Sequence, residues 1–430
     1  MPAKLGQVSA DEAAALVRPV DTLLTGFIGG QPGAILEAIG ARTDLTDVTL
    51  FTGLLGAPYR LLLNPGVRTV SGFFGPVERA ARAQGCRVEY LAADFHGLEA
   101  LALQQKPRVV LAVTTPPDAD GYLSFGIHPA AVYRPFIEAA ADPGRLAVAQ
   151  VNPHMPRLDG LPEFGRNRVH VSEVDAWVEH AEVPTALPIP EASPDDLAIA
   201  RRVNELVGCG VTLQFGIGAI PNEVARALAE GPDDDIGIHT EMLSDGVMHL
   251  HRAGKVTNRK GLYDGVTVAT FALGSADLYK WLDQNPDVRM LPVPYVNDPA
   301  LLRRLRNFVS INGALAVDLL GQIAADHVAG RQYSGVGGHE SFVAGAREAP
   351  GGRSIVCLRS TAVVGGRRVS TIMSQLGAGD AVTTPRHHTQ WVITEHGAVD
   401  LSVLGDRSRA SALIGLAHPD FRDGLRAAAS

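Results

Sequence analysis

The 430-residue sequence contains three cysteines, Cys86, Cys209 and Cys357, which lie far apart and form no CxxC pair. Their odd number and wide spacing argue against a disulfide framework and against a cysteine-based zinc site. No apolar run reaches the 18 residues of a membrane-spanning helix, and the polar segment Met1–Gln7 lacks the apolar core of a signal peptide. We therefore expect a cytoplasmic protein.

Positive charge is also scarce, because 38 Lys and Arg residues face 46 Asp and Glu residues, for a net charge of -8. Without a long basic run, the sequence lacks the electrostatic footprint of nucleic-acid or anionic-membrane binding. The 46% hydrophobic and 20% charged residues are typical of a globular enzyme, and the length favours two domains. Small molecules are the expected partners.

Short β-branched or apolar runs alternate with helix-like segments from residue 47 onward. The clearest runs are Val109–Val113 and Leu146–Val151, and each is followed by a proline-rich loop. Such alternation predicts an α/β fold in which mainly parallel sheets are flanked by helices. Ligands gather at the carboxyl ends of such strands, which makes the following loops candidate walls of a site.

Four prolines, Pro184, Pro188, Pro190 and Pro194, fall between Glu182 and Asp195 with little apolar periodicity. This composition predicts an extended connection rather than a helix or a central strand. We place the domain boundary there, which gives an N-terminal domain of residues 1–185 and a C-terminal domain of residues 186–430. The α/β pattern restarts after the boundary, although no exact sequence repeat is visible.

A glycine loop follows the predicted strand Val211–Phe215 and precedes a helix that runs to about Ala229. Its free N–H groups and the helix N-terminus are suited to an anion such as a pyrophosphate. A tight turn without a ligand is an equally good interpretation of this pattern alone. The loop comprises Gly216, Ile217, Gly218, Ala219 and Ile220.

Two glutamates stand at the carboxyl ends of predicted strands. Glu241 follows the run Ile236–Thr240, and Glu395 follows the run Trp391–Thr394. Most acidic residues are solvated surface groups, so the position raises the expectation of chemistry only modestly. Glu395 is the weaker of the two candidates.

A second glycine cluster contains Gly335, Gly337 and Gly338. Three glycines in four positions permit a backbone path that points several N–H groups inward, as in an oxyanion hole. A tight structural loop is the competing interpretation. Asn297 and Asn312 lie in turn-like contexts nearby in sequence, where capping is the commoner role.

The histidine pairs His249/His251 and His387/His388 match no zinc-binding spacing. Residues two apart do not share one face of a helix, and the second pair lies in a polar stretch. We therefore predict solvent-facing histidines and no metal.

Six motifs together resemble the acetyl-CoA hydrolase/transferase family, in order and in spacing, over nearly the whole chain. They are Pro116–Tyr122, Val151–Pro156, Gly216–Pro221, His239–Gly246, Ser334–Gly338 and Ala417–Arg422. The resemblance implies two CoA-transferase-type domains with the active site between them and Glu241 as the catalytic glutamate. CoA and acyl-CoA would be substrates, and no resident cofactor is expected.

The same resemblance implies that Gly216 to Ile220 contact CoA, that Gly335, Gly337 and Gly338 lie beside the thioester, and that Asn297 supplies an active-site amide. His339 is assigned to CoA binding with them. Family members usually have Gly-Gly-Gln-x-Asp-Phe in the second glycine loop. This chain has His339 in place of the glutamine and Ser341 in place of the aspartate. The departure puts the individual acyl and CoA contacts in question.

A glutamate suits this chemistry for a general reason. With an ordinary pKa of about 4.3 it is ionised at neutral pH and attacks a thioester without a general base. The expected activity is a CoA-transferase that passes CoA from a short-chain acyl-CoA to an acid such as acetate. An acyl-CoA hydrolase that uses the same glutamate is the alternative, and a non-catalytic CoA-ester or nucleotide sensor is a third. We expect a homodimer or a higher homo-oligomer.

Overall fold

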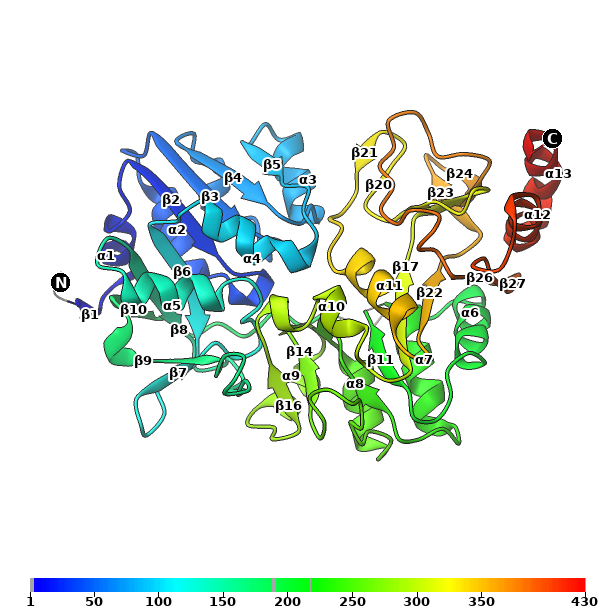
Figure 1. Cartoon of the computed structure of the whole chain (residues 1–430). Helices are drawn as coiled ribbons and strands as arrows, with labels where there is room; N and C mark the ends of the chain where they lie inside the picture. Colours follow the sequence, from blue (N-terminus) through cyan, green and yellow to red (C-terminus); the bar gives the residue numbers. More distant parts are fainter. Residues whose placement is uncertain (1–3, 188–190, 217, 430) are drawn as a thin grey trace. The chain divides into compact units, whose positions relative to one another are not determined.

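The computed structural model describes residues 4–187, 191–216 and 218–429. The chain folds into two compact units (Figure 1). The first unit comprises residues 1–187 and 268–296, and the second comprises residues 188–267 and 297–430. Among the described residues, no helix has the length and apolar character needed to cross a membrane.

An eight-stranded sheet forms the centre of the first unit, and all of its neighbouring strands run parallel. Runs rich in Val, Leu and Thr form its strands, as expected for strands covered on both faces. In spatial order they are β1 (Gly6–Gln7), β10 (Ala176–Glu179), β8 (Leu146–Val151), β6 (Val109–Thr114), β2 (Val20–Thr25), β3 (Asp47–Thr52), β4 (Val67–Ser71) and β5 (Val88–Tyr90).

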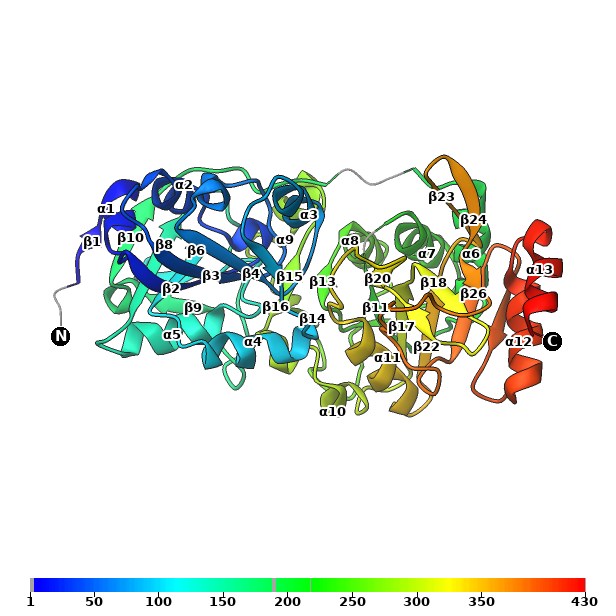
Figure 2. The same ribbon diagram turned by 90° about the horizontal axis from the view of Figure 1, so that it is seen from above.

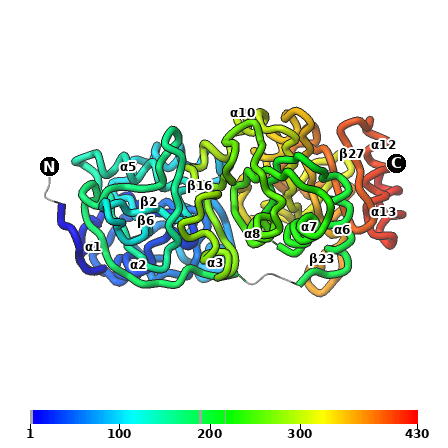
Figure 3. Tube along the Cα trace, turned by 90° about the horizontal axis from the view of Figure 1, so that it is seen from below, coloured from blue at the N-terminus to red at the C-terminus, as the bar shows by residue number. Residues whose placement is uncertain are grey.

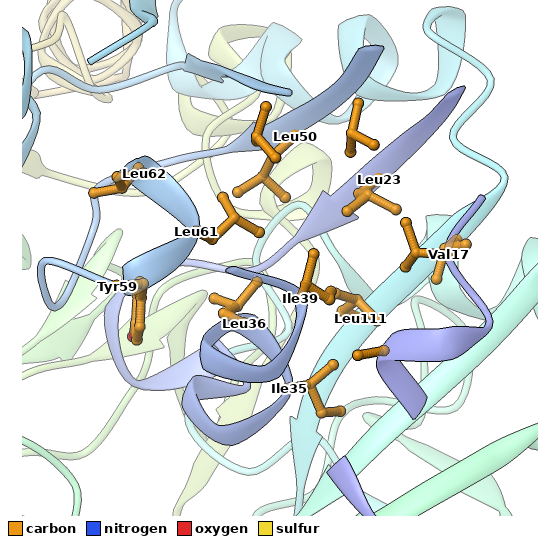
Figure 4. Packing of buried hydrophobic residues seen from close by; sticks show 14 of the residues in the cluster. Val17, Leu23, Ile35, Leu36, Ile39, Leu50, Tyr59, Leu61, Leu62 and Leu111 are labelled. Carbon is orange, nitrogen blue, oxygen red and sulfur yellow. The ribbon is translucent and has the colours of Figure 1, made fainter. Parts of the chain in front are cut away.

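Helices cover both faces of this sheet. The helices α1 (Ala10–Ala15), α2 (Gly33–Ala41) and α3 (Pro76–Ala83) contribute to one hydrophobic cluster, and α4 (Phe95–Gln104) and α5 (Tyr133–Ala141) contribute to another (Figure 2). Successive strand residues alternate between the two clusters, as a pleated strand requires. Leu23 belongs to the same cluster as Ile35 and Leu36 of α2 (Figure 4), whereas Leu24 belongs to the opposite cluster.

The second unit contains a six-stranded sheet. It is parallel except at one edge, where β26 and β27 form an antiparallel pair. In spatial order its strands are β12 (Gly237–Ile238), β11 (Thr212–Phe215), β17 (Phe308–Gly313), β22 (Arg353–Cys357), β26 (Trp391–Thr394) and β27 (Gly397–Asp400). Because β12 is an edge strand of two residues, the longer strand predicted up to Thr240 is wrong in length.

The helices of the second unit include α6 and α7, which pack side by side (Figure 3). Its helices are α6 (Pro194–Asn204), α7 (Ala219–Glu230), α8 (Asp245–Arg252), α10 (Pro299–Leu302), α11 (His339–Glu348), α12 (Asp406–Leu416) and α13 (Pro419–Ala429). Short strands complete the unit: β18 (Ala316–Asp318), β19 (Ile323–Ala324) and β25 (Ile372–Met373) form a small sheet, while β20 (His327–Val328) with β21 (Arg331–Gln332) and β23 (Thr361–Val364) with β24 (Arg367–Ser370) form ribbons.

The structure confirms the predicted α/β class with parallel sheets between helices. It differs from the predicted division into residues 1–185 and 186–430, because Val268–Val296 belongs to the first unit. This segment contains α9 (Ala276–Leu282) and β16 (Val288–Met290), and its backbone N–H groups donate to carbonyls of Ile127, Ala130, Arg157 and Asp159. Pro188 and Pro190 of the predicted connection lie outside the described residues.

Candidate active site

Glu241 lies three residues beyond β12, in a bend directly before the short strand β13 (Met242–Leu243), which precedes α8. The N–H of His239 still donates to the carbonyl of Leu213 at 3.1 Å, which continues the pairing with β11. The hydroxyl of buried Thr240 reaches the carbonyl oxygens of Phe215 at 3.2 Å and Met242 at 3.1 Å. The backbone is therefore fixed on both sides of Glu241.

Two donors from distant segments meet the Glu241 carboxylate. The Nδ2 amide of Asn297, which is fully buried just before α10, donates to Oε2 at 2.6 Å. The backbone N–H of Gly338, at the start of α11, donates to the same carboxylate. The structure thus brings together three of the predicted catalytic or binding residues: Glu241, Asn297 and Gly338.

Gly338 is required by close packing rather than by backbone conformation. Its φ of -89° is open to any residue. A Cβ at this position would lie 2.1 Å from Oε2 of Glu241 and 2.4 Å from Nδ2 of Asn297. Glycine therefore lets the backbone N–H approach the carboxylate.

Burial raises the pKa of Glu241 to about 7, and the hydrogen bonds from Asn297 and Gly338 oppose that rise. The expectation of a fully ionised glutamate at neutral pH is therefore wrong for this environment. The fraction of molecules that carry the carboxylate therefore rises with pH through the neutral range. The higher pKa also makes the carboxylate a stronger base, which favours nucleophilic attack.

The other predicted glycines of the second glycine loop lie just before Gly338 in the chain. Gly337 has a φ of +57°, a left-handed conformation that favours glycine. Gly335 precedes it, and its carbonyl accepts a hydrogen bond from the Ser334 hydroxyl at 3.1 Å. Of the three glycines, Gly338 provides an N–H that reaches Glu241.

His339 occupies the first turn of α11, with 8% of its surface exposed. Burial lowers its pKa to about 4, opposed by Asp326 and by a hydrogen bond to the carbonyl of Gly313. The imidazole is therefore neutral at physiological pH and links the glycine loop to the end of β17. The side chain of Ser341, which also departs from the family pattern, is buried as well.

Glu340, the next residue in the first turn of α11, also has hydrogen-bond partners. Its carboxylate accepts hydrogen bonds from the Thr384 hydroxyl at 2.6 Å and from Nδ1 of His388 at 2.5 Å. The prediction of solvent-facing histidines is thus wrong for His388, and also for half-buried His251, whose Nε2 lies 2.8 Å from the Thr267 hydroxyl. His249 and His387 are exposed, as predicted.

The first glycine loop lines a hollow of about 350 Å³ in the second unit. Gly216, Gly218, Ala219 and Ile220 form one wall, and residues 311–314 and 357–359 form others. Gly218 has a φ of +124°, and open space surrounds the position of a Cβ at Gly216. These glycines leave room for a ligand near the N-terminus of α7. Ile217, the remaining predicted residue of this loop, lies outside the described residues.

Sequence reasoning missed two charged residues that line the hollow. Arg359 follows β22, and its guanidinium donates to both carboxylate oxygens of Asp196 at 2.8 and 2.5 Å. Asp196 is also part of a capping box at the start of α6, which explains its burial. The capping motif is visible in the sequence, but nothing there links it to an arginine 163 residues later.

Comparison of the chain with known proteins identifies its family. The family model for the acetyl-CoA hydrolase/transferase C-terminal domain matches residues 274–429. The chain is 37% identical to the succinyl-CoA:cyclohexane-1-carboxylate CoA transferase of Geobacter metallireducens, over 97% of this chain and 93% of the relative. It is 38% identical to the 4-hydroxybutyrate coenzyme A transferase of Clostridium kluyveri, over 82% of this chain and 80% of the relative.

The solved structure of RipA from Yersinia pestis is similar, with a TM-score of 0.90 and 35% identity over 98% of this chain and 96% of that chain. The chain belongs to the acetyl-CoA hydrolase/transferase family. Within it, an acetyl-CoA hydrolase of Kluyveromyces lactis is 28% identical over only 49% of this chain and 39% of the relative. The two relatives named first, which match over at least 80% of both chains, are CoA-transferases, and the chain is an enzyme of that class.

Proposed function

We propose that the protein transfers CoA from a short-chain acyl-CoA to a carboxylic acid such as acetate, through a thioester between CoA and Glu241. The observation that carries the proposal is the contact of the Glu241 carboxylate with the Asn297 amide and the Gly338 N–H. Relatives named for succinyl-CoA, cyclohexane-1-carboxylate and 4-hydroxybutyrate support substrates of this kind.

The reaction begins when a carboxylate oxygen of Glu241 attacks the carbonyl carbon of the acyl-CoA. The carbon–sulfur bond breaks, CoA leaves as its thiolate, and a mixed anhydride of the acyl group and Glu241 remains. The thiolate then attacks the glutamyl carbonyl, and the first acid leaves as a carboxylate. The enzyme now holds a glutamyl-CoA thioester, and no net proton has been gained or lost.

The second acid reverses these steps. Its carboxylate attacks the glutamyl thioester, which releases CoA thiolate and forms a new anhydride. The thiolate attacks the acyl carbonyl of that anhydride, so that the new acyl-CoA leaves and Glu241 is free again. Each step retains the energy of the activated acyl group, provided that water does not reach the anhydride.

The donors at Glu241 suit the two steps in which its own carbonyl is attacked. Negative charge then develops on a glutamyl oxygen, and Asn297 Nδ2 already lies 2.6 Å from Oε2 in the resting enzyme. The Gly338 N–H donates a hydrogen bond to the same carboxylate. Donors that are fixed before reaction stabilise such an oxyanion without reorganisation. The hollow beside Gly216 and Gly218 is our proposed binding place for part of CoA.

An exchange assay tests the proposal and separates it from the alternative of an acyl-CoA hydrolase. Purified enzyme is given butyryl-CoA with isotopically labelled acetate, and the products are followed by mass spectrometry and by a thiol reagent. We expect labelled acetyl-CoA with little free thiol. Free thiol at the same rate with and without acetate would establish hydrolysis instead. Neither product at any substrate pair would favour the non-catalytic sensor.

We further propose that CoA and acyl-CoA act as substrates without a resident cofactor, in a cytoplasmic homodimer or higher homo-oligomer. The net charge of -8 and the scarcity of cysteine support this setting. Light scattering of the purified protein measures the assembly, and a mass near that of one chain would contradict it.

A further inference from the structure

The strand that leads to Glu241 is β12, which stands at the edge of the six-stranded sheet. Among the described residues no strand of that sheet pairs with its outer side. Side chains and backbone from residues 255–260 occupy that edge. At Ile236 the partners are backbone groups: its N–H donates to the Lys255 carbonyl at 2.9 Å, and its carbonyl accepts from the Thr257 N–H at 2.9 Å. Two residues further along the strand, at Ile238, the hydrogen-bond partners are side chains rather than backbone groups.

Both backbone groups of Ile238 are bonded to side chains of this segment. Its N–H donates to Oδ1 of Asn258 at 2.9 Å, and its carbonyl accepts from Nζ of Lys260 at 3.0 Å. Asn258 and Lys260 thus supply one acceptor and one donor, as a neighbouring strand would. Glu241 follows three residues later.

Lys260 is built into the protein interior. It is fully buried, and its Nζ also donates to the carbonyl of Val266 at 2.5 Å. Its aliphatic stem lies against the strand, because a Cβ at Gly237 would come within 2.4 Å of Lys260 Cγ. Burial lowers the pKa of this amine to about 7, opposed by Asp264. Burying a lysine is costly, and the reaction steps above do not use its amine.

We propose that Lys260, with Asn258, is a positioning residue for Glu241: it replaces the missing neighbour strand of β12 and so fixes the register of the catalytic turn. The inference rests on the proposed role of Glu241. Rotating or shifting the turn moves the carboxylate away from Asn297 and Gly338, and an error of about 1 Å at a reacting atom costs up to about 100-fold in rate.

The test compares Lys260→Met with Lys255→Met in the full-length enzyme. Methionine keeps the apolar length of lysine but removes the donors to Ile238 and Val266. Lys255 lies in the same segment, but its Nζ donates at 2.6 Å to the Gly231 carbonyl at the end of α7 rather than to β12. The measurements are kcat and KM for butyryl-CoA, the rate of CoA attachment to Glu241, and Tm.

We expect Lys260→Met to lower kcat and the rate of CoA attachment by about ten-fold or more, with KM for butyryl-CoA within about two-fold. Lys255→Met should retain wild-type kcat. If both variants lose Tm while kcat per folded molecule stays at the wild-type value, Lys260 has no positioning role. Absence of exchange in the wild-type enzyme would instead refute the proposed function.

A second variant decides the outcome if Lys260→Met does not fold. Asn258 has a φ of +56°, so that glycine fits its backbone while removing the acceptor for the Ile238 N–H. We expect Asn258→Gly to lower kcat more than it raises KM. Wild-type kcat in folded Asn258→Gly would overturn the proposal.

Discussion

Glu241 and Glu395 both follow strands of the same sheet, β12 and β26. Their carboxylate oxygens, however, have different hydrogen-bond partners. Ser360 covers Glu395: its N–H donates to Oε2 at 2.9 Å and its hydroxyl donates to Oε1. The His396 ring adds a contact of 3.4 Å to Oε1. Both oxygens of Glu395 thus serve to hold neighbouring residues in place.

Glu241 instead meets an amide and a backbone N–H that come from separate segments, and burial raises its pKa to about 7. The comparison separates two carboxylates that share a strand-end position. The donors at Glu241 suit the oxyanion of the proposed reaction, whereas those at Glu395 hold a neighbouring loop. Each prediction below is a way to break or to sharpen this contrast.

The largest effect is expected from Gly338→Ala. The new Cβ would meet Glu241 Oε2 at 2.1 Å, so the carboxylate must leave its donors. We expect exchange activity to fall about 100-fold or more, as for misplaced reacting groups. In a Glu241→Ala background the same substitution should cost less Tm, because the clashing carboxylate is gone.

Gly337→Ala is the matched control for that measurement. It strains a backbone with a φ of +57° and should destabilise the fold by about 1 kcal/mol with a smaller loss of kcat. Equal losses of kcat in the two variants would mean that the loop acts only as a structural turn.

The next effect is a pH dependence. Because the carboxylate is the attacking form and its pKa is about 7, kcat/KM for acyl-CoA should fall as the pH drops below 7 and level off above about 8. Asn297→Leu removes a donor that holds this pKa down, so the midpoint should move to higher pH. Initial rates between pH 5.5 and 9 give both midpoints. A profile that stays flat down to pH 5.5 contradicts the raised pKa.

The smallest effect on turnover is expected at the other glutamate. Glu395→Gln converts one carboxylate oxygen into an amide group that cannot accept from Ser360. The loss should be about 1 kcal/mol, or about 2–4 °C in Tm, with kcat within about two-fold of wild type. A loss of kcat comparable to that of Glu241→Gln would erase the distinction between the two residues.

Much of the fold was predictable because buried parallel strands have short, continuous apolar sequences, such as Val109–Val113 and Leu146–Val151. The division into units was predicted less well. Val268–Val296 returns to the first unit through backbone hydrogen bonds to residues 127–159, and such pairing leaves no composition signal along the chain.

The site likewise depends on contacts that the sequence alone does not reveal. Glu241 and Gly338 were predicted from their motifs, and the structure brings them into contact, but the pKa of Glu241 depends on burial that only the folded chain creates. Lys260 escaped notice because a lysine in a polar segment is normally solvated. Its contact with Ile238 depends on an edge strand shorter than the apolar pattern indicates.

The most direct test of the central claim is to locate CoA on the enzyme. The protein is incubated with butyryl-CoA without an acceptor acid, treated with borohydride, and mapped by peptide mass spectrometry. A thioester carbonyl is reducible whereas a carboxylate is not, so the account predicts conversion of Glu241 to the corresponding alcohol, with activity lost only after exposure to acyl-CoA. Modification of Glu395, or full exchange activity in the Glu241→Gln variant, would contradict it.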